Sequence, residues 1–153
     1  MLPKSATRVA EHTPEYINQQ IREQTVKNIS ECVINGPLSI DQRLEELDEE
    51  WDIERTLQAN ASSLILLGMG LGALSSRKWF ALPVMVSGFL LQHALQGWCP
   101  PLSVFRRMGV RTKGEIDVER YALKALRGDF QEFCEKTAHD TGASREAIIT
   151  ASR

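Results

Sequence analysis

Two long stretches without a charged side chain constrain the fold of this chain more than any other feature. Asp, Glu, Lys and Arg make up 25% of its 153 residues, yet none occurs in residues 56–76 or 79–105. A helix needs about 20 mostly apolar residues to cross a hydrocarbon core of about 30 Å. Residues 57–76 and 79–98 meet that length and are separated only by a short basic turn. The sequence therefore predicts a membrane hairpin of two transmembrane helices.

Two buried helices of a soluble domain are the alternative interpretation, since polar residues and Pro83 lower the hydropathy of both segments. Neither segment carries the charged face that a helix on a soluble surface shows. Covering both helices on every side would also take much of the remaining chain. Length and lack of charge therefore favour the membrane interpretation.

Polar side chains gather toward the ends that an antiparallel hairpin brings together. One lies near the start of the first segment and the others near the end of the second: Asn60, Gln92, His93 and Gln96. Polar groups in a spanning helix can mark a binding site or a proton path. Their position in the last turns favours a structural role, in which they bond to one another or to nearby serines at the membrane boundary.

Tryptophan and basic residues define the expected placement in the bilayer. Trp51, Trp79 and Trp98 lie near segment boundaries, where indole rings anchor at the interface between lipid and water. Lys and Arg are more frequent beside the shared ends of the hairpin than in its turn. The positive-inside rule then places both termini in the cytoplasm, which agrees with unpaired cysteines in a reducing compartment.

Small residues repeat every four positions in the first segment, at Gly68, Gly72 and Ser76. Such a strip lets another helix approach closely in lipid, where apolar side chains gain little by burial. A leucine stripe on another face, from Leu64 to Leu74, implies a second neighbour. Two interpretations of the glycines stay open: they pack the two helices of one hairpin, or they pack against a second copy or a partner subunit.

The flanking regions predict further helices, which makes the whole chain all-α. In residues 1–54 a helix is expected from Thr13, whose hydroxyl serves as the N-cap, to about Cys32. Gly36 and Pro37 then interrupt it for separate backbone reasons.

A second helix is expected from Ser39, which forms a capping-box pattern with Gln42. No Gly or Pro follows until after Leu67, so one continuous helix is predicted to pass from water into the hairpin region, residues 55–110.

The C-terminal region, residues 111–153, begins with another capping-box pattern, formed by Thr112 and Glu115. Gly128 is placed to end that helix. A further helix and a break at residues 142–144 are expected after it.

Charge and cysteine content argue against several functional classes. The net charge is −2 and acidic residues concentrate before the hairpin, so the basic patch of a nucleic-acid-binding protein is missing. Three widely spaced cysteines form neither a disulfide framework nor a zinc or redox CxxC motif. No metal, cofactor or catalytic motif is recognised, and no cleavable secretory signal is expected.

Cys99 is the one candidate for a reactive thiol. Pro100 and Pro101 end the helix behind it, and Arg106 and Arg107 are near enough in sequence to favour a thiolate. The alternative, a small half-buried residue at a tight turn, is the favoured interpretation.

The helix exit GWCPPLSVFRRMGV, residues 97–110, follows a glycine cluster in the first segment. The residues of this pattern are Gly68, Gly70, Gly72, Gly97, Trp98, Cys99, Pro100, Gly109 and Val110. The pattern resembles the YgaP-like transmembrane family, bacterial inner-membrane hairpins of unknown function, over about Ile53 to Val110. The flanking helices are similar to a longer subgroup of that family. Some members carry a rhodanese domain, which this chain lacks, so the resemblance implies membrane location and self-association rather than sulfur transfer.

These observations together predict a non-enzymatic protein of the bacterial inner membrane with both termini in the cytoplasm. Its expected partners are membrane lipids and either a second copy of the chain or a larger membrane complex, to which it is an anchor or an accessory subunit. Two other classes remain as alternatives: a sulfur or redox carrier that works through Cys99, and a small pore lined by the polar residues of the hairpin.

Overall fold

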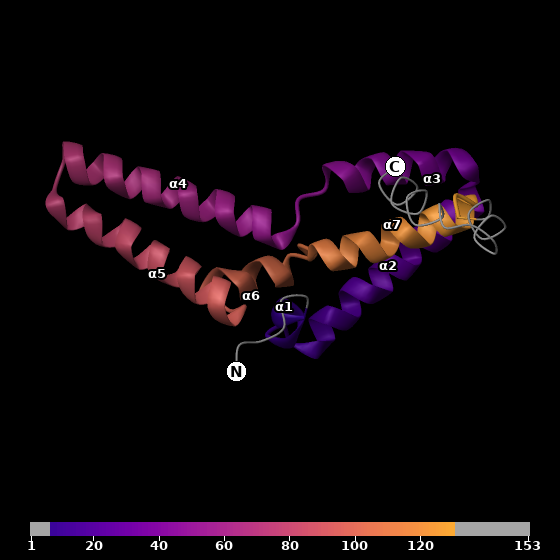
Figure 1. Ribbon diagram of the computed structural model, residues 1–153, viewed down its shortest axis with the longest axis horizontal. Coiled ribbons are helices and arrows are strands. Elements are labelled where there is room, and N and C mark those ends of the chain that lie inside the picture. The colour runs from indigo at the N-terminus through magenta and orange to yellow at the C-terminus, as the bar shows by residue number, and fades with distance from the viewer. Residues whose placement is uncertain (1–6, 131–153) are drawn as a thin grey trace, which may run out of the picture. The chain divides into compact units, whose positions relative to one another are not determined.

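The computed structural model describes residues 7–130, and every regular element in that range is helical (Figure 1). In chain order the elements are α1 (Arg8–Glu11), α2 (Glu15–Asn35), α3 (Pro37–Glu49), α4 (Ile53–Leu74), the 3₁₀ helix η1 (Arg77–Phe80), α5 (Ala81–Gln96), α6 (Pro100–Arg107) and α7 (Lys113–Arg127). The predicted all-α class is therefore confirmed for residues 7–130. The predicted break at residues 142–144 lies outside the described residues, as does Cys134.

The chain divides into two compact units. The first unit consists of Met1–Glu23 and Trp51–Ile116, and the second unit consists of Gln24–Glu50 and Asp117–Arg153. Residues 1–54 contribute to both units, and the three regions expected from sequence stay a prediction.

The first unit contains the hairpin, in which α4 and α5 run antiparallel and are joined by η1 (Figure 1). Both glycines of the small-residue strip are buried where the two arms meet. A Cβ atom on Gly68 would lie 2.6 Å from Cδ of Pro83, and one on Gly72 would lie 2.9 Å from the ring of Phe80. Ser76 is exposed and begins η1, so it lies outside this contact. The glycines thus pack the arms of one hairpin against each other.

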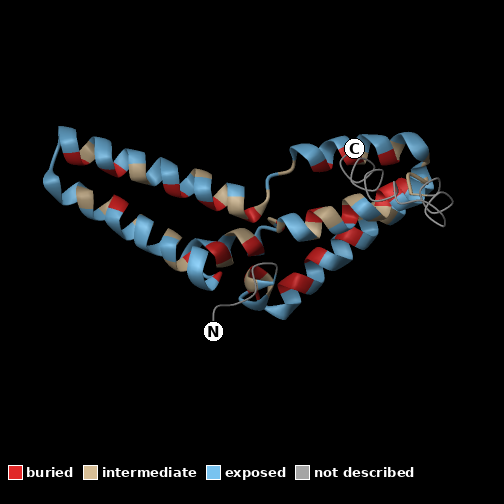
Figure 2. Cartoon of the chain, viewed as in Figure 1, coloured by how far each residue is buried: buried red, intermediate tan, exposed pale blue. Residues whose placement is uncertain are grey.

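Much of the hairpin surface is exposed (Figure 2), and large apolar residues are among the exposed positions. Leu66 is 73% exposed, Leu74 is 90% exposed and Val84 is 73% exposed. The leucine stripe predicted from Leu64 to Leu74 belongs to this surface, since Leu64 and Leu67 are also exposed.

One stretch among the described residues is long and apolar enough to cross a membrane. This stretch, Pro37–Leu74, contains α3, the non-helical residues 50–52 and α4, and only 17% of its most apolar window is buried. A core helix of a soluble protein passes the same test but is mostly buried. α5 has 16 residues, about 24 Å of helix, and alone it falls short of the hydrocarbon thickness of about 30 Å.

The continuous helix predicted from Ser39 into the hairpin is wrong, because the chain leaves helical geometry between Glu50 and Asp52. Glu50 has an extended backbone, and the Asp52 carboxylate accepts a hydrogen bond of 2.7 Å from the N–H of Arg55. Asp52 is therefore a new N-cap that starts α4 independently of α3. The N–H of Ile53 donates to the carbonyl of Arg111 at 2.8 Å and fixes this start within the first unit.

Two other predicted helix caps are also wrong. The Thr13 hydroxyl donates to the carbonyl of Val9 at 2.7 Å instead of capping α2, which begins at Glu15. Ser39 lies inside the first turn of α3, because Gly36, at a φ of 90°, places Pro37 at the first helical position. Neither Ser39 nor any other side chain caps α3.

The capping box at the start of α7 is confirmed in both directions. The N–H of Thr112 donates to the Glu115 carboxylate at 2.7 Å, and the N–H of Glu115 donates to the Thr112 hydroxyl at 3.2 Å. Gly128 ends the helix as predicted, with a φ of 95° and its N–H on the carbonyl of Lys124.

Candidate functional site

The polar residues predicted to cluster at the open end of the hairpin do not bond to one another. Asn60 donates to the carbonyl of Thr56 at 2.9 Å and so bonds within its own helix. Gln96 is exposed and Gln92 is half-buried, whereas His93 is 2% exposed. Of these four residues, only His93 is buried, so its protonation and hydrogen bonding depend on neighbouring protein groups and not on water.

A carboxylate from the other arm of the hairpin pairs with His93. The Nε2 atom of His93 lies 3.1 Å from Oε2 of Glu54, at the start of α4. The other carboxylate oxygen of Glu54 accepts a hydrogen bond of 2.9 Å from Arg8. Arg8 also donates to the carbonyl of Ala94 on α5. These contacts join α1, α4 and α5, and no local sequence pattern predicts them because the partners are far apart in the chain.

The environment of Glu54 favours its charged form. The hydrogen bond with His93 is the largest cause, partial burial opposes it, and the bond from Arg8 adds to it, so the pKa of Glu54 falls to about 2. An ionised carboxylate can only accept hydrogen bonds, so Nε2 of His93 donates to it. Nδ1 is then the ring nitrogen left to accept a proton when the ring is neutral.

Cys99 lies in the core of the first unit, 4% exposed, where it packs with Val9, Ile53 and Leu57. Its thiol interacts electrostatically with the His93 ring, and Nδ1 of that ring is buried without a hydrogen-bond partner in the described chain. The favoured expectation of a half-buried turn residue underestimates how deeply Cys99 is enclosed. The structure brings together a thiol, an imidazole and a carboxylate.

Arg106 does not support a thiolate at Cys99, contrary to the expectation from sequence. Its side chain is 1% exposed and its donors are taken by acceptors within the first unit. Nε donates to Thr13, Nη1 donates to Val110 and Glu115, and Nη2 donates to Asn18 and Glu115, at distances from 2.7 to 3.2 Å. Arg107 is exposed.

Gly97 positions the cluster because two separate features of its backbone require glycine. It ends α5 in the left-handed region, at a φ of 76°, and its N–H donates to the carbonyl of His93. A Cβ atom at this position would also lie 2.6 Å from Cβ of Arg8. Gly97 thus lets α1 approach the end of α5 closely enough for Arg8 to reach Glu54.

An apolar cavity of about 80 Å³ opens beside Cys99, between the two arms of the hairpin. Its walls are mainly aliphatic and aromatic: Leu57, Ala61, Leu64, Val86, Phe89 and Leu90. Asn60, Cys99 and Pro101 complete the lining. The thiol is therefore buried from water but borders an apolar space.

The three tryptophans predicted as interface anchors are all exposed. Trp51 is 49%, Trp79 is 45% and Trp98 is 37% exposed. Trp51 lies outside the helices, and the guanidinium of Arg55 stacks 4.3 Å from the centre of its ring. Exposure leaves all three rings free to contact an interface.

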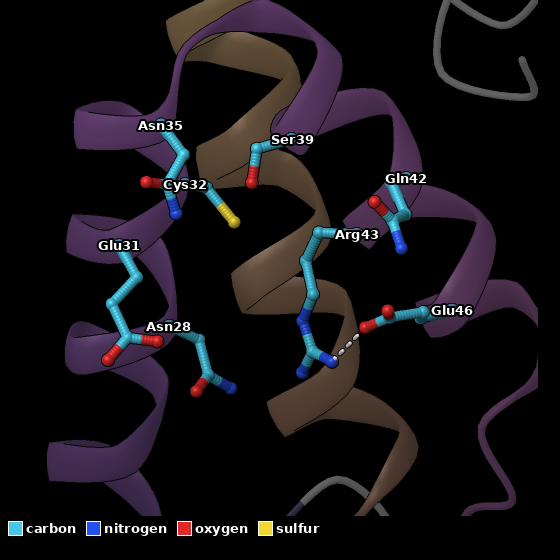
Figure 3. Close-up of a pocket in the computed structure, with 8 residues that line it drawn as sticks. All are labelled: Asn28, Glu31, Cys32, Asn35, Ser39, Gln42, Arg43 and Glu46. Atoms are coloured by element: carbon cyan, nitrogen blue, oxygen red, sulfur yellow. Dashed lines mark hydrogen bonds and ion pairs between the residues drawn. The ribbon is translucent and has the colours of Figure 1, made fainter.

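The second unit holds a polar cavity of about 290 Å³ between α2 and α3 (Figure 3). Arg43 lies at its wall, where it donates to Glu46 and to the fully buried Glu119, each at 2.8 Å. Cys32 also lines the cavity. The charges of Arg43 are thus neutralised by neighbouring carboxylates, which leaves a less defined chemical site than the one at Cys99.

Residues 7–130 contain no group of three or more His, Cys, Asp or Glu side chains arranged to hold a metal ion. Comparison of the chain with protein-family models, with curated proteins and with solved structures finds no match in any of them.

Proposed function

We propose that this chain is a non-enzymatic protein of the bacterial inner membrane, in which the α4–α5 hairpin crosses the bilayer twice. Both termini lie in the cytoplasm. The protein acts as an oligomerising anchor or as an accessory subunit of a larger membrane complex. The resemblance of about Ile53 to Val110 to the YgaP-like family, itself a hypothesis from the sequence, favours the same placement.

The exposed apolar surface of α4 and α5 carries this proposal. Contiguous exposed apolar surface marks a membrane or protein contact, since each Å² left in water costs about 25 cal/mol. In the hairpin this surface lies on both arms and includes Leu66, Leu74 and Val84. Charged side chains are absent from residues 56–76 and 79–105, so no charge on these faces opposes entry into lipid.

The length of the second arm is compatible with a second span once η1 is included. The two apolar residues of η1, Trp79 and Phe80, at about 2.0 Å each add about 4 Å to the 24 Å of α5. The sum is close to the hydrocarbon thickness, and a small mismatch is absorbed by tilt or local thinning of the bilayer. Arg77 and Lys78 then lie at the far interface and Trp79 beside them.

Association with a second copy or a partner uses the leucine face in this proposal, because Gly68 and Gly72 are already occupied within the hairpin. Leu67 is 55% exposed and lies on that face with Leu74. We observe nothing that favours the pore, since Asn60 bonds its own helix and His93 is buried against Glu54.

Labelling with a membrane-impermeant maleimide tests the topology. In a background without the native cysteines, Ser76→Cys reports the turn and Lys113→Cys reports the side of the termini. We expect labelling of Ser76→Cys only from the periplasmic side and of Lys113→Cys only after the cytoplasmic side is opened. Labelling of both positions from one side would contradict a hairpin that spans the bilayer.

Purification from native membranes in mild detergent tests the anchoring role. Leu67→Ser combined with Leu74→Ser is expected to release a second copy or a partner, whereas Gly70→Ser, on an open position of the same helix, leaves the association intact. A wild-type chain that is monomeric and unaccompanied under these conditions would contradict this role.

A further inference from the structure

We propose that Cys99 is a site of S-acylation, which accepts a fatty acyl group from a long-chain acyl-coenzyme A with His93 as the base. The modification would attach an acyl chain to the open end of the hairpin. This proposal requires only the geometry of the first unit, so it does not depend on whether the hairpin spans a membrane.

The geometry around the thiol supplies the base and its support. The thiolate is the reactive form of cysteine, and a neighbouring imidazole oriented by a third group is the usual way to generate it. Here the His93 ring lies beside the Cys99 thiol, and Glu54 holds Nε2 at 3.1 Å. Nδ1 remains buried without a partner in the described residues, which leaves one nitrogen to take the thiol proton.

The helix that follows Cys99 does not provide an alternative source of activation. Cys99 is the N-cap of α6, but Pro100 and Pro101 occupy the next positions and carry no N–H. The N–H of Leu102 already bonds to the carbonyl of Cys99 at 3.1 Å. Arg106 is occupied by its own acceptors. The imidazole is therefore the group that activates the thiol.

The apolar cavity beside Cys99 determines the class of acyl donor. It is lined mainly by aliphatic and aromatic side chains, so it accepts the first methylene groups of a fatty chain beside the thioester carbonyl, while the charged coenzyme A group stays outside it. With a volume of about 80 Å³ it is too small for a whole long chain. The remainder would follow the exposed apolar surface that begins at Leu64 and Phe89.

The reaction balances without an oxidant or a reductant. His93 removes the thiol proton, and the Cys99 sulfur attacks the thioester carbonyl of the acyl-coenzyme A. The new carbon–sulfur bond forms as the bond to the coenzyme A sulfur breaks. The leaving thiolate takes the proton from His93, which returns the imidazole to its starting form.

Incubation of the detergent-purified full chain with palmitoyl-coenzyme A tests this proposal by intact mass spectrometry. We expect the mass to rise by one palmitoyl group, which hydroxylamine removes, and peptide mapping to place it on Cys99. Cys32→Ala should be acylated as the wild type is, whereas Cys99→Ala should not. Acylation mapped elsewhere in the wild type, or none at all, would overturn the proposal even if Cys99→Ala fails to fold.

Two further variants separate activation from a structural effect. His93→Gln should slow acylation by about 100-fold, the size of a typical general-base contribution, and should change the pH dependence of the rate. Leu64→Trp, at the half-exposed edge of the cavity, should slow the reaction with palmitoyl-coenzyme A but not with acetyl-coenzyme A. An unchanged acylation rate and pH profile in His93→Gln would contradict the role of His93 as the base that takes the thiol proton.

Discussion

Arg106 shows how a buried charge becomes part of the scaffold around the thiol. Its planar guanidinium donates from all three nitrogens, with Glu115 accepting from both Nη1 and Nη2 at 2.7 and 2.8 Å. The same carboxylate completes the capping box of α7 through Thr112. A single side chain of α6 therefore links the capped start of α7 to Thr13 and Asn18.

Replacing Arg106 is expected to destabilise the protein strongly. Arg106→Met removes two hydrogen bonds to the half-buried Glu115 carboxylate and one to the buried Asn18 side chain, a loss of about 3 kcal/mol in the free energy of unfolding. Arg107→Met, one position further on the same helix but exposed, should change that free energy by less than about 0.5 kcal/mol. Denaturant unfolding in detergent solution measures both, and equal effects would contradict the buried network.

Glu54 makes the stability of the first unit depend on acid. Its pKa falls from 4.5 in an unperturbed chain to about 2 in the folded protein, chiefly through the hydrogen bond with His93. Because the folded state holds the proton less tightly, this contribution is complete above pH 4.5 and is lost as the pH falls toward 2.

Thermal unfolding between pH 5 and pH 2 measures the contribution of Glu54. Glu54→Gln should lower the unfolding temperature at pH 5. Between pH 5 and pH 2 the unfolding temperature of this variant should fall by less than that of the wild type. Some acid dependence should remain, because the pKa of Glu115 also lies below its usual value: burial raises it, and the hydrogen bonds from Arg106 and Thr112 together more than offset that effect. Glu45→Gln, an exposed position in the second unit, is the control. If the unfolding temperatures of the wild type and Glu54→Gln fall in parallel with pH, the contact of Glu54 with His93 does not contribute to stability.

At the residue scale, sequence patterns identified which side chains were unusual but not what they contact. His93 and Cys99 were both singled out, yet the partner of His93 was expected among Asn60 and nearby serines, whereas it is Glu54. Hydrogen-bond partners across a hairpin depend on the rotation of each helix, and no local pattern sets that rotation.

At the element scale, Gly68 and Gly70 of α4 separate packing within the hairpin from packing between copies. Gly68→Ala forces a Cβ atom within 2.6 Å of the rigid Pro83 ring, so the arms must shift at a cost of about 1 to 3 kcal/mol. Gly70→Ala adds the same atom where nothing lies within 4 Å. It should stabilise the helix by about 0.5 to 1 kcal/mol, because Ala loses less backbone entropy than Gly.

Thermal unfolding and light scattering in detergent measure these two effects. We expect Gly68→Ala to lower the unfolding temperature without changing the number of associated chains. A smaller assembly with an unchanged unfolding temperature would show that Gly68 faces another copy instead of α5.

Helix boundaries were predictable where one local interaction dominates. Thr112 with Glu115 and the left-handed Gly128 define α7 from short-range chemistry alone. Ser39 failed as a cap because Pro37 had already started the helix two residues earlier. The break before Ile53 contains neither Gly nor Pro, and a hydrogen bond from the distant Arg111 carbonyl helps to hold it.

At the scale of the whole molecule, uncharged segments predicted the existence and pairing of α4 and α5, because charge and length act on entire helices. The division into two units was not predictable in the same way. α2 changes its packing partners along its own length, with Ile17 and Ile21 in the first unit and Cys32 in the second. An amphipathic pattern records that a residue is buried but not which neighbour buries it.

The proposed placement of the hairpin in lipid predicts different responses from exposed leucines in the two units. Leu66 lies midway along the first predicted span and is 73% exposed, whereas Leu126 on α7 is 55% exposed in the second unit. An arginine at the middle of a spanning helix raises its insertion free energy by about 2.5 to 3.5 kcal/mol. Leu66→Arg should therefore reduce the fraction of protein retained in alkali-washed membranes, while Leu126→Arg leaves it unchanged because α7 stays in water. The same retention for both variants would mean that lipid does not surround α4, and the exposed apolar face of the hairpin would then require a protein partner to cover it.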